Sequence, residues 1–331
     1  MPELPEVEIT ARRLDGALCG ASIESALAPG INALRSFDPP LTELAGRTIA
    51  GVRRRGKHLI VEIDGVDRDR DGAGVDGAGA GVDGDGGGAG VELVLLIHLM
   101  SAGRLQLYDK RAGPRDRTSR LLVRGRLPAA GETPAQPGGA TSEVGVAREA
   151  ELRLREFGSK QAAWVKLLRA DELDREHSLA TLGPEAWPDP GGRDRFKELL
   201  DAPRPLHTML RDQHTIAGIG RSWVDEILWE AQLSPYKRGA DLTEEEAGRL
   251  REATVAILGA AIEHYEGAIA LPIPDKLPMP LRIHRHEGQP CPRCATTLQS
   301  VHFEDYVIAY CPTCQTEGRV LKDRRLSRLL K

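Results

Sequence analysis

The sequence lacks long hydrophobic runs, has few aromatic residues and contains five cysteines among 331 residues. The longest strongly apolar run, residues 91–100, is interrupted by Glu92 and His98 and is too short to span a bilayer. No basic start followed by an apolar stretch is present, which excludes a recognisable secretory signal. We therefore expect a cytoplasmic protein with no membrane partner, and its length suggests about two domains.

The few cysteines are concentrated near the C-terminus, which argues against a disulfide framework distributed over the chain. Four of them form two Cys-x-x-Cys pairs separated by sixteen residues, and Cys19 is left over. In a cytosolic protein this spacing indicates a metal site, because each pair presents two thiolates on a tight knuckle. We expect one structural Zn²⁺ held by Cys291, Cys294, Cys311 and Cys314, with no open position for catalysis.

Positive charge is only slightly outnumbered and is unevenly distributed: 45 Lys and Arg against 49 Asp and Glu give a formal net charge of −4. Residues 64–90 contain seven Asp and two Arg, a net of −5, so the rest of the chain carries −4 − (−5) = +1. From Lys276 to the end, ten Lys and Arg against five Asp and Glu give a net of +5. The acidic total therefore does not exclude a polyanionic partner for the basic C-terminal part.

Short apolar alternations dominate the first half of the sequence, and helical periodicity dominates the second half. Residues 6–18 have helical spacing, and the strand-like segments after them are 48–54, 58–63, 91–96, 104–108, 120–124 and 152–157. Several short strands without alternating helices favour an antiparallel sandwich. Helical patterns occupy residues 194–262, so the sequence predicts an α+β fold of two domains.

Composition also suggests boundaries within the chain. We expect an N-terminal domain at residues 1–170, a polar proline-rich linker at 171–190, a helical domain at 191–281, and a cysteine-rich finger with its tail at 282–331. Residues 65–90 and 128–147 are rich in small residues and poor in large apolar side chains. Such segments cannot bury enough surface to offset the entropy of ordering, so both are expected to be flexible insertions.

The first eight residues, Met-Pro-Glu-Leu-Pro-Glu-Val-Glu, suggest covalent catalysis. If Met1 is removed, the nitrogen of Pro2 becomes a free secondary amine, which can attack a carbonyl-like carbon and form an iminium. Because the pKa of an α-amino group is about 7.7–8.0, part of it is unprotonated near neutral pH. The neighbouring Glu3 can move protons. The alternative is an ordinary helix start, in which proline and acidic residues favour the first turn.

Two further motifs contain residues suited to a phosphate. Lys57 follows three arginines and a glycine, and it can hold a phosphate or protonate a leaving group; the alternative is a solvated basic turn. The glycines of residues 216–220 allow backbone amides to approach an anion closely. A plain connection between two helices has the same appearance, so this alternative also stays open.

Taken in order, these motifs resemble the formamidopyrimidine-DNA glycosylase and endonuclease VIII family. The segments that carry the resemblance are 2–8, 56–59, 182–185, 216–220, 225–226 and 291–315. The match runs from Pro2 to the C-terminus, apart from the two insertions. It implies an N-terminal antiparallel β-sandwich with a catalytic N-terminal helix, followed by a helix–two-turn–helix domain and a Cys₄ zinc ribbon.

The resemblance implies a monomeric DNA glycosylase and abasic-site lyase that excises oxidised bases from double-stranded DNA and cleaves the backbone by β,δ-elimination. It makes Pro2 the Schiff-base nucleophile, Glu3 the general acid, Glu6 a supporting carboxylate and Lys57 a phosphate contact that assists catalysis. The preferred lesion stays open between formamidopyrimidine or 8-oxoguanine, oxidised pyrimidines, and abasic sites alone. A catalytically weak damage-binding protein and a zinc-ribbon adaptor without chemistry are the alternatives from other classes.

The resemblance also implies contacts that fill the gap left by a flipped nucleotide. Either Met100 or Ser101 would enter the duplex, with Arg155 nearby and Phe157 as a stacking wedge. A core aromatic at a strand end is the alternative for Phe157. The usual Arg-Arg-Phe appears here with Glu156 at its centre, which places an acid near the DNA.

This sequence departs from the family pattern at two further positions, both of which are expected to contact the DNA backbone. Gly220 and Arg221 belong to the expected contact, although the family usually has Asn where this chain has Arg221. Tyr306 occupies the place of a usual ribbon arginine. The basic residues available to compensate for it are Arg319, Lys322, Arg324 and Arg325.

Overall fold

The computed structural model describes residues 2–30, 32–64, 90–113, 116–128, 148–158, 160–303 and 306–323. The expected insertions at 65–90 and 128–147 lie outside these residues, except for Gly90 and Pro128. The strands are β1 (Ser22–Leu27), β2 (Ile49–Arg55), β3 (His58–Asp64), β4 (Val91–His98), β5 (Gly103–Tyr108), β6 (Ser119–Leu127), β7 (Arg148–Glu156), β8 (Trp164–Arg169), β9 (Gln299–Phe303) and β10 (Tyr306–Tyr310). The α-helices are α1 (Leu4–Leu18), α2 (His177–Ala180), α3 (Arg193–Leu200), α4 (Leu206–Arg211), α5 (Arg221–Glu230), α6 (Glu244–Ala268) and α7 (Pro312–Thr316). Short 3₁₀ segments are η1 (Leu41–Leu44), η2 (Ala170–Arg175) and η3 (Gly239–Asp241).

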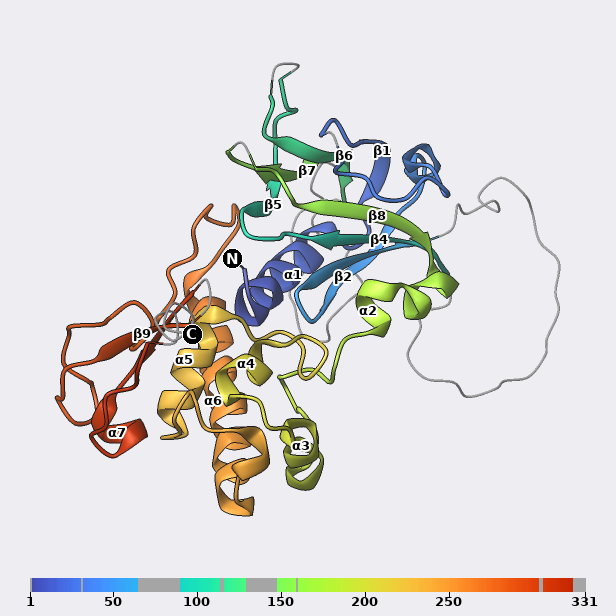
Figure 1. The fold of residues 1–331 in the computed structure, drawn as a ribbon. Helices are drawn as coiled ribbons and strands as arrows, with labels where there is room; N and C mark the ends of the chain where they lie inside the picture. The colour runs from blue at the N-terminus through green and yellow to red at the C-terminus, as the bar shows by residue number, and fades with distance from the viewer. Residues whose placement is uncertain are drawn as a thin grey trace, which may run out of the picture.

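Two antiparallel four-stranded sheets form the N-terminal half (Figure 1). Their strand orders are β1-β6-β7-β5 and β2-β3-β4-β8. Alternate buried side chains of β3 and β4, such as Leu59 and Leu95, belong to the main apolar core, and the others, such as Ile60 and Leu96, form a second cluster. The predicted antiparallel sandwich is confirmed. The sequence prediction missed β1 and β8, and both are edge strands.

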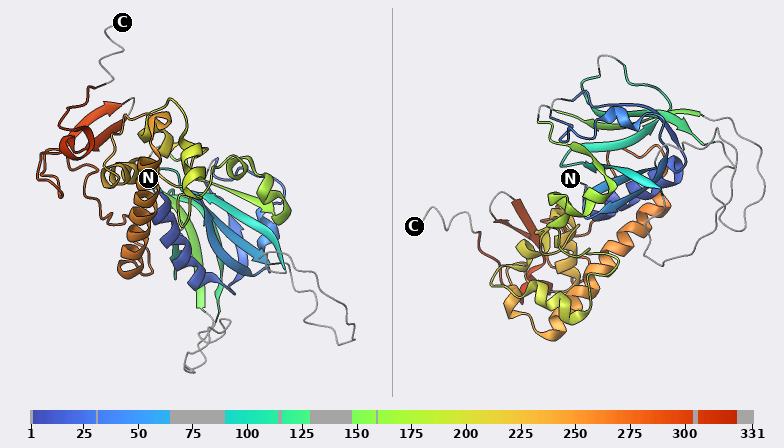
Figure 2. Two further views of the ribbon diagram at one scale, coloured as in Figure 1. Left: turned by 90° about the horizontal axis from the view of Figure 1, so that it is seen from below. Right: turned by 90° about the vertical axis from the view of Figure 1, so that its right-hand side faces the viewer.

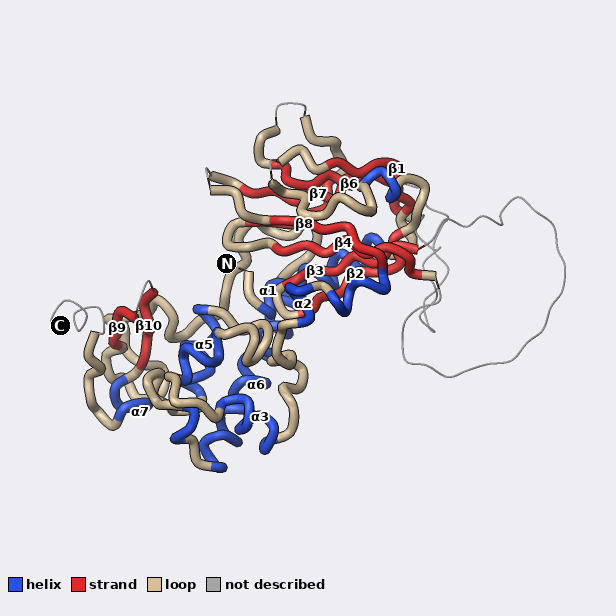
Figure 3. The backbone as a smooth tube through the Cα atoms, turned by 45° about the vertical axis from the view of Figure 1, so that its right-hand side comes forward, coloured by secondary structure: helices blue, strands red, loops and turns tan. Residues whose placement is uncertain are grey.

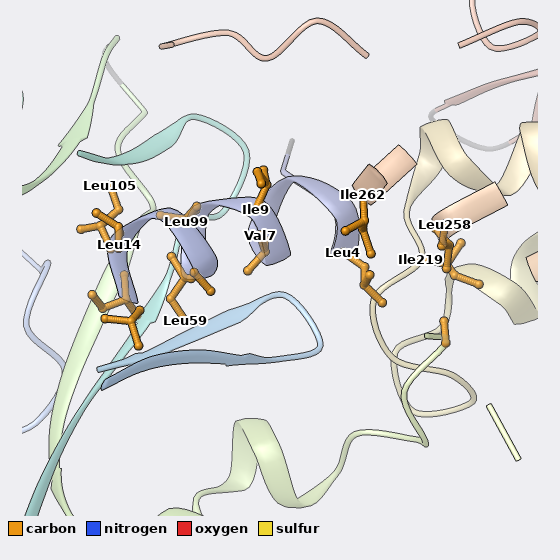
Figure 4. Close-up of a cluster of buried hydrophobic side chains, with 14 of the residues drawn as sticks. Leu4, Val7, Ile9, Leu14, Leu59, Leu99, Leu105, Ile219, Leu258 and Ile262 are labelled. Atoms are coloured by element: carbon orange, nitrogen blue, oxygen red, sulfur yellow. The ribbon is translucent and has the colours of Figure 1, made fainter. Parts of the chain in front are cut away.

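The N-terminal helix α1 connects the sandwich with the C-terminal helices. Pro5 lies in its first turn, where a missing N–H removes no intrahelical bond. Leu4, Val7, Leu14 and Leu18 recur at helical spacing and are buried. Figure 4 shows that this stripe contacts side chains from both halves of the molecule. Burial of each large apolar side chain contributes about 1.5–3 kcal/mol, so α1 is firmly docked.

The C-terminal half contains helices α3 to α6 and a zinc-ribbon hairpin. The long helix α6 packs against both α1 and α5. Figure 2 shows α6 running from the helical half toward the sandwich, and Figure 3 shows β9 and β10 at the far edge of that half. No helix among the described residues is long and apolar enough to cross a membrane. The predicted α+β class with two structural halves is confirmed, and we propose the domain boundaries given above.

The segment 171–190 is more ordered than a simple linker, because it contains most of η2 and all of α2. Its Glu185 accepts a hydrogen bond from the backbone N–H of Gly56 at 2.6 Å and forms an ion pair with Arg55 at 2.7 Å. A second connection joins β5 to the proline-rich loop after α6, since Gln106 Nε2 donates to the carbonyl of Ile273 at 2.6 Å. The two halves are therefore joined at two further places besides α1.

Candidate active site and zinc ribbon

Pro2 lies on the wall of a cavity of about 530 Å³. The same cavity is lined by Glu6 and Thr10 of α1, Gln106 of β5 and the loop residues 273, 274 and 276–279. A volume of this size lies within the range of small-molecule sites. The helix start, the sandwich and the proline-rich loop thus border one space beside Pro2.

Glu3 directs its carboxylate at the beginning of α5. Its Oε1 accepts a hydrogen bond from the backbone N–H of Ser222 at 2.9 Å, and its Oε2 accepts one from Trp223 at 3.3 Å. A Cβ at Gly220 would lie only 2.2 Å from Cδ of Glu3, so only glycine leaves room for this carboxylate. Glu3 is therefore held by amides in the first turn of α5, which follow the glycine-containing turn that the sequence suggested for a phosphate.

Glu6 is buried directly behind Glu3. Its carboxylate accepts hydrogen bonds from the backbone N–H of Glu3 at 2.8 Å, the Tyr265 hydroxyl at 2.8 Å and the indole N–H of Trp223 at 3.2 Å. Burial, together with the negative charge of Glu3, raises the pKa of Glu6 to about 7. Glu6 can therefore exchange a proton near neutral pH.

Lys57 lies in the tight turn between β2 and β3 and is 8% exposed, so the solvated basic turn is wrong for this residue. Its Nζ donates a hydrogen bond to the carbonyl of Ile219 at 2.7 Å. Burial lowers the pKa of Lys57. The lysine, Glu3 and the turn before α5 therefore form one cluster.

The loop at 100–103 presents Ser101 to solvent, whereas Met100 is half-buried against an apolar cluster that includes Trp164. Met100 has a φ of 50°, and its N–H donates to Nδ1 of His98 at 2.9 Å. Burial lowers the pKa of His98 to about 3, so this imidazole is neutral and can accept the bond. The free structure thus exposes Ser101 more than Met100.

Phe157 follows the end of β7 and is 45% exposed, so the core alternative for this aromatic is wrong. The Cζ of Arg155 lies 4.6 Å from the centre of the Phe157 ring. Glu156 has the opposite environment, because it is 0% exposed, accepts the N–H of Ala163 at 2.8 Å and lies 3.7 Å from Arg120. The expectation that this acid faces the DNA is therefore corrected: alternation along β7 points it into the sandwich.

The ribbon residue Tyr306 is also buried, at 6% exposed. Arg221 is the first residue of α5, and its guanidinium carbon lies 5.4 Å from the Tyr306 ring centre. Arg319 forms a 2.9 Å ion pair with Glu317, and Lys322 follows it in the chain. Arg324 and Arg325 lie outside the described residues.

The four ribbon thiols gather as their spacing predicts. The Sγ atoms of Cys291, Cys294, Cys311 and Cys314 all lie within 4.8 Å of one another. Zn–S bonds of about 2.3 Å place tetrahedral sulfurs about 3.8 Å apart, so the donor set fits one Zn²⁺. The indole N–H of Trp229 donates to Sγ of Cys291 at 3.4 Å. The predicted zinc site is confirmed.

Some residues around the carboxylates had no local signal in the sequence. Trp223 and Tyr265 are 217 and 259 positions from Glu6, with which both form hydrogen bonds. Both carry large apolar surfaces at helical spacing, which indicates a core position. Only the folded chain reveals their polar contacts.

Comparison with known families agrees with this geometry. Residues 1–133 match the formamidopyrimidine-DNA glycosylase N-terminal domain, and residues 182–272 match the formamidopyrimidine-DNA glycosylase H2TH domain. Residues 288–316 match a zinc finger found in that glycosylase and in isoleucyl-tRNA synthetase, which places the four cysteines in a known finger.

A full-length relative decides the family. The formamidopyrimidine-DNA glycosylase of Thermus thermophilus is 30% identical over 329 residues, which cover 96% of this chain and 100% of the relative. The chain belongs to the formamidopyrimidine-DNA glycosylase family. An uncharacterized formamidopyrimidine-DNA glycosylase-like protein of Mycobacterium tuberculosis is 39% identical over 150 residues, covering 45% of this chain and 94% of the relative.

Solved structures of the formamidopyrimidine-DNA glycosylase family share the fold. The Lactococcus lactis protein in complex with DNA containing an abasic site superposes with a TM-score of 0.72 at 25% identity, covering 95% of this chain and 99% of that chain. A complex of a mutant of the same glycosylase, with DNA that contains a Fapy-dG lesion, has a TM-score of 0.71 at 24% identity and covers 95% of this chain and 100% of that chain. The chain is thus a member of a family of base-excision DNA repair enzymes, with DNA as partner.

Proposed function

We propose that this chain excises oxidised bases of the formamidopyrimidine and 8-oxoguanine type from double-stranded DNA and then cleaves the abasic site. The observation that carries the proposal is the position of Pro2, which borders the cavity. Glu3 and Glu6 lie beside Pro2. Extruding a base costs a few kcal/mol, and the cost is smaller for a damaged pair. Because Pro2 borders the cavity, a nucleotide that is flipped into the cavity can reach the Pro2 nitrogen.

The first step proposed is attack of the Pro2 nitrogen on C1′ of the deoxyribose, after removal of Met1. The glycosidic bond breaks with its electron pair going to the departing base, which takes up a proton. Glu3 then delivers a proton to the ring oxygen as the sugar opens. The nitrogen of Pro2 loses its own proton and becomes the iminium, so atoms and charge balance.

Strand cleavage follows from the iminium. It acidifies C2′, whose proton is removed as the 3′ phosphate leaves in β-elimination, and a second proton loss expels the 5′ phosphate in δ-elimination. Glu6 supports these transfers, because its pKa of about 7 lets it carry a proton near neutral pH. No redox or organic cofactor takes part in these steps.

Residues around this centre hold the duplex. Lys57 contacts a phosphate near the lesion, supported by its place beside Glu3 and the turn before α5. Phe157, supported by Arg155, stacks into the duplex, and the loop with Met100 and Ser101 fills the remaining gap. The zinc bound by the four ribbon cysteines supplies folding energy for the ribbon and no chemical step. We propose that the protein acts in the cytoplasm, where thiols stay reduced.

Borohydride trapping tests the nucleophile. The protein is reduced on a duplex with one abasic site, and mass spectrometry maps the cross-linked residue. We expect Pro2. The buried Lys57, whose pKa is lowered, is the strongest competing amine, so a cross-link at Lys57 would overturn the mechanism.

Two variants sharpen the same experiment. Pro2→Gly keeps a primary amine and should retain a trapped adduct with altered efficiency. Lys57→Ala should slow excision of damaged bases more than cleavage of preformed abasic sites, because the latter need no departing base. A panel of single-lesion duplexes then ranks the lesions, and a preference for oxidised pyrimidines over formamidopyrimidine would overturn the proposed specificity.

A further inference from the structure

A buried amide on β5 fastens the proline-rich loop to the sandwich. Gln106 is 6% exposed, and its Nε2 donates hydrogen bonds to the carbonyl of Ile273 at 2.6 Å and to Oδ1 of Asp275 at 2.9 Å. A carbonyl and an ionised carboxylate only accept, so the amide has one possible orientation. Because Gln106 and Ile273 both line the cavity, these bonds fix the position of one cavity wall.

The hydroxyl of Tyr108 extends these contacts along β5. Side chains two positions apart on a strand face the same side of the sheet, which places Tyr108 beside Gln106. The hydroxyl donates to Oε1 of Gln106 and accepts a hydrogen bond from Nη1 of Arg155 at 2.9 Å. A guanidinium can only donate, so all the bonds run in one direction, from Arg155 through Tyr108 and Gln106 to Asp275. We call these four residues the sheet–loop network.

Arg155 is held on its other side by a second hydroxyl. Its Nε donates to Oγ1 of Thr118 at 3.2 Å, and that hydroxyl donates to Oδ1 of Asp116 at 2.6 Å. Burial opposes the charge of Arg155, but the bond to Tyr108 and the charge of Asp275 outweigh it and raise the pKa of the guanidinium. Arg155 is therefore a fixed cation at one end of the network.

Phe157 lies next to that cation and faces solvent. The Cζ of Arg155 lies 4.6 Å from the centre of the Phe157 ring, within the ~6 Å over which an aromatic face attracts a cation. The Phe157 side chain is 45% exposed. The sheet–loop network thus connects an exposed aromatic ring with the wall of the cavity.

We propose that Gln106 and Tyr108 are positioning residues that couple Phe157 to the cavity wall. Insertion of Phe157 into the duplex and entry of the damaged base into the cavity then favour each other. The inference rests on the proposed function, because it concerns the same bound duplex. Coupling between two sites is reciprocal, so the factor by which an ordered loop favours the inserted Phe157 equals the factor by which the inserted Phe157 favours the ordered loop.

The burial of Gln106 is what allows a displacement to pass along the network. A shift of the loop either leaves the amide nitrogen without its acceptors, which is costly for a buried group, or moves the amide with the loop. A moved amide takes its oxygen away from the Tyr108 hydroxyl, which orients Arg155. A displacement at the loop therefore reaches the guanidinium beside Phe157.

The alternative is that the network only fastens the loop to the sheet. Loss of a simple fastening lowers the stability of the protein and leaves the behaviour of Phe157 in the duplex unchanged. Loss of coupling changes the insertion of Phe157 even though Phe157 itself is intact. A measurement of insertion therefore separates the two roles.

The experiment uses the full-length, zinc-loaded protein and a duplex in which 2-aminopurine lies next to a tetrahydrofuran abasic analogue. The fluorescence of 2-aminopurine rises when an inserted side chain unstacks it, and the analogue has no C1′ hydroxyl and forms no iminium. Tyr108→Phe removes one hydroxyl and keeps the ring, whose centre lies 4.2 Å from Cζ of Arg153. We expect the fluorescence rise to slow by about threefold or more. The matched control is Tyr236→Phe, which removes a hydroxyl 3.5 Å from the carbonyl oxygen of Lys322 and should keep the parent rate.

Asp275→Ala tests whether the loop acts on Phe157 through Tyr108. The variant removes one acceptor of Gln106 and should slow the fluorescence rise by a similar factor. Combined with Tyr108→Phe it should cause no further loss, because the connection is already broken.

Three results would overturn the coupling: a parent-like rate in Asp275→Ala, fully additive losses in the double variant, or a Tyr108→Phe protein in which only the melting temperature falls. A parent protein that gives no fluorescence rise would overturn both the insertion of Phe157 and its coupling. Borohydride trapping at Pro2 is scored separately. Failed trapping together with the expected fluorescence would therefore overturn the proposed chemistry and leave the coupling intact.

Discussion

The carboxylate of Glu3 and the backbone amide of Ser222 lie 2.9 Å apart and form a hydrogen bond across 219 residues of sequence. This bond joins the residue beside the proposed nucleophile to the first turn of α5. Gly220 makes it possible, since any side chain there would occupy the space of the carboxylate. The position of the proposed acid thus depends on the C-terminal half.

Gly220→Ala should displace Glu3, because the added Cβ would lie 2.2 Å from its Cδ. A displacement of about 1 Å at a reacting group costs about 100-fold in rate, so we expect a loss of that order in single-turnover base release. Gly16→Ala is the control: it lies in α1 with nothing within 4 Å of the added Cβ and should stabilise by up to ~1 kcal/mol. Equal rates in the two variants would contradict the role given to Glu3.

Glu3→Gln should bind a duplex with an abasic analogue as the parent does and should lose base release. The amide oxygen of glutamine can still accept the N–H of Ser222, but it has no proton to deliver to the sugar. Gel-shift binding and single-turnover excision, measured on one preparation, separate the two properties. Retained excision would show that another group supplies the proton.

The buried Glu6 should make stability depend on pH. Its pKa is raised from 4.5 unfolded to about 7 folded, so between these values the folded state binds more protons than the unfolded state. Stability from this group is therefore complete below about pH 4.5, falls as pH rises to about 7, and is level above it, with a total on the order of a few kcal/mol. Plots of the urea midpoint against pH over this range should have different slopes for the parent and for Glu6→Gln. Parallel plots would count against the raised pKa of Glu6.

Removing a ribbon thiolate should release zinc. Cys311→Ser is expected to lower zinc content and weaken DNA binding while the sandwich stays folded, because metal binding supplies much of a ribbon's folding energy. Cys19→Ser is the matched control, since its Sγ lies 3.1 Å from the carbonyl of Ala50 and a hydroxyl can keep that bond. Elemental analysis and hydrogen exchange in β3 and β4 provide the readouts. A parent protein without zinc, purified free of chelators, would refute the site.

Deleting residues 65–90 and joining the strands through Asn-Gly should preserve folding and activity. Asp64 of β3 pairs with Val91 of β4, so a two-residue hairpin turn can connect them. The deletion also removes six Asp and two Arg, a net charge of −4, and so should tighten DNA binding. Circular dichroism and binding assays test this, and an unfolded product would show that the segment is required.

The sequence predicted the core strands well because β3 and β4 are short apolar runs, and both strands are buried over four or five consecutive residues. It missed β1 and β8; only one residue of β1 is fully buried, so that strand shows little apolar pattern. The linker prediction at 171–190 also overlooked α2, since a four-residue helix offers little periodicity.

Within the site, the sequence identified the groups that can be recognised from residues close together in the chain. The four cysteines and the Pro2-Glu3 start are such groups. Glu156 was misjudged because neighbouring residues on a strand face opposite sides, and the sequence alone did not establish which side faced the core. The contacts of Glu6 with Tyr265 depend on tertiary packing and have no local pattern.

The hydrogen bond between Glu6 and Tyr265 spans 259 positions of the chain. This separation determines which events come first while the chain is being synthesised. A growing chain exposes its first turn to the cell long before residue 265 leaves the ribosome. Enzymes that trim the initiator methionine therefore meet an accessible end, while the carboxylate environment that would make the new amine reactive toward DNA is still absent. If Pro2 is the nucleophile, as proposed above, its amine is released first and becomes reactive only when the helical half has folded around it.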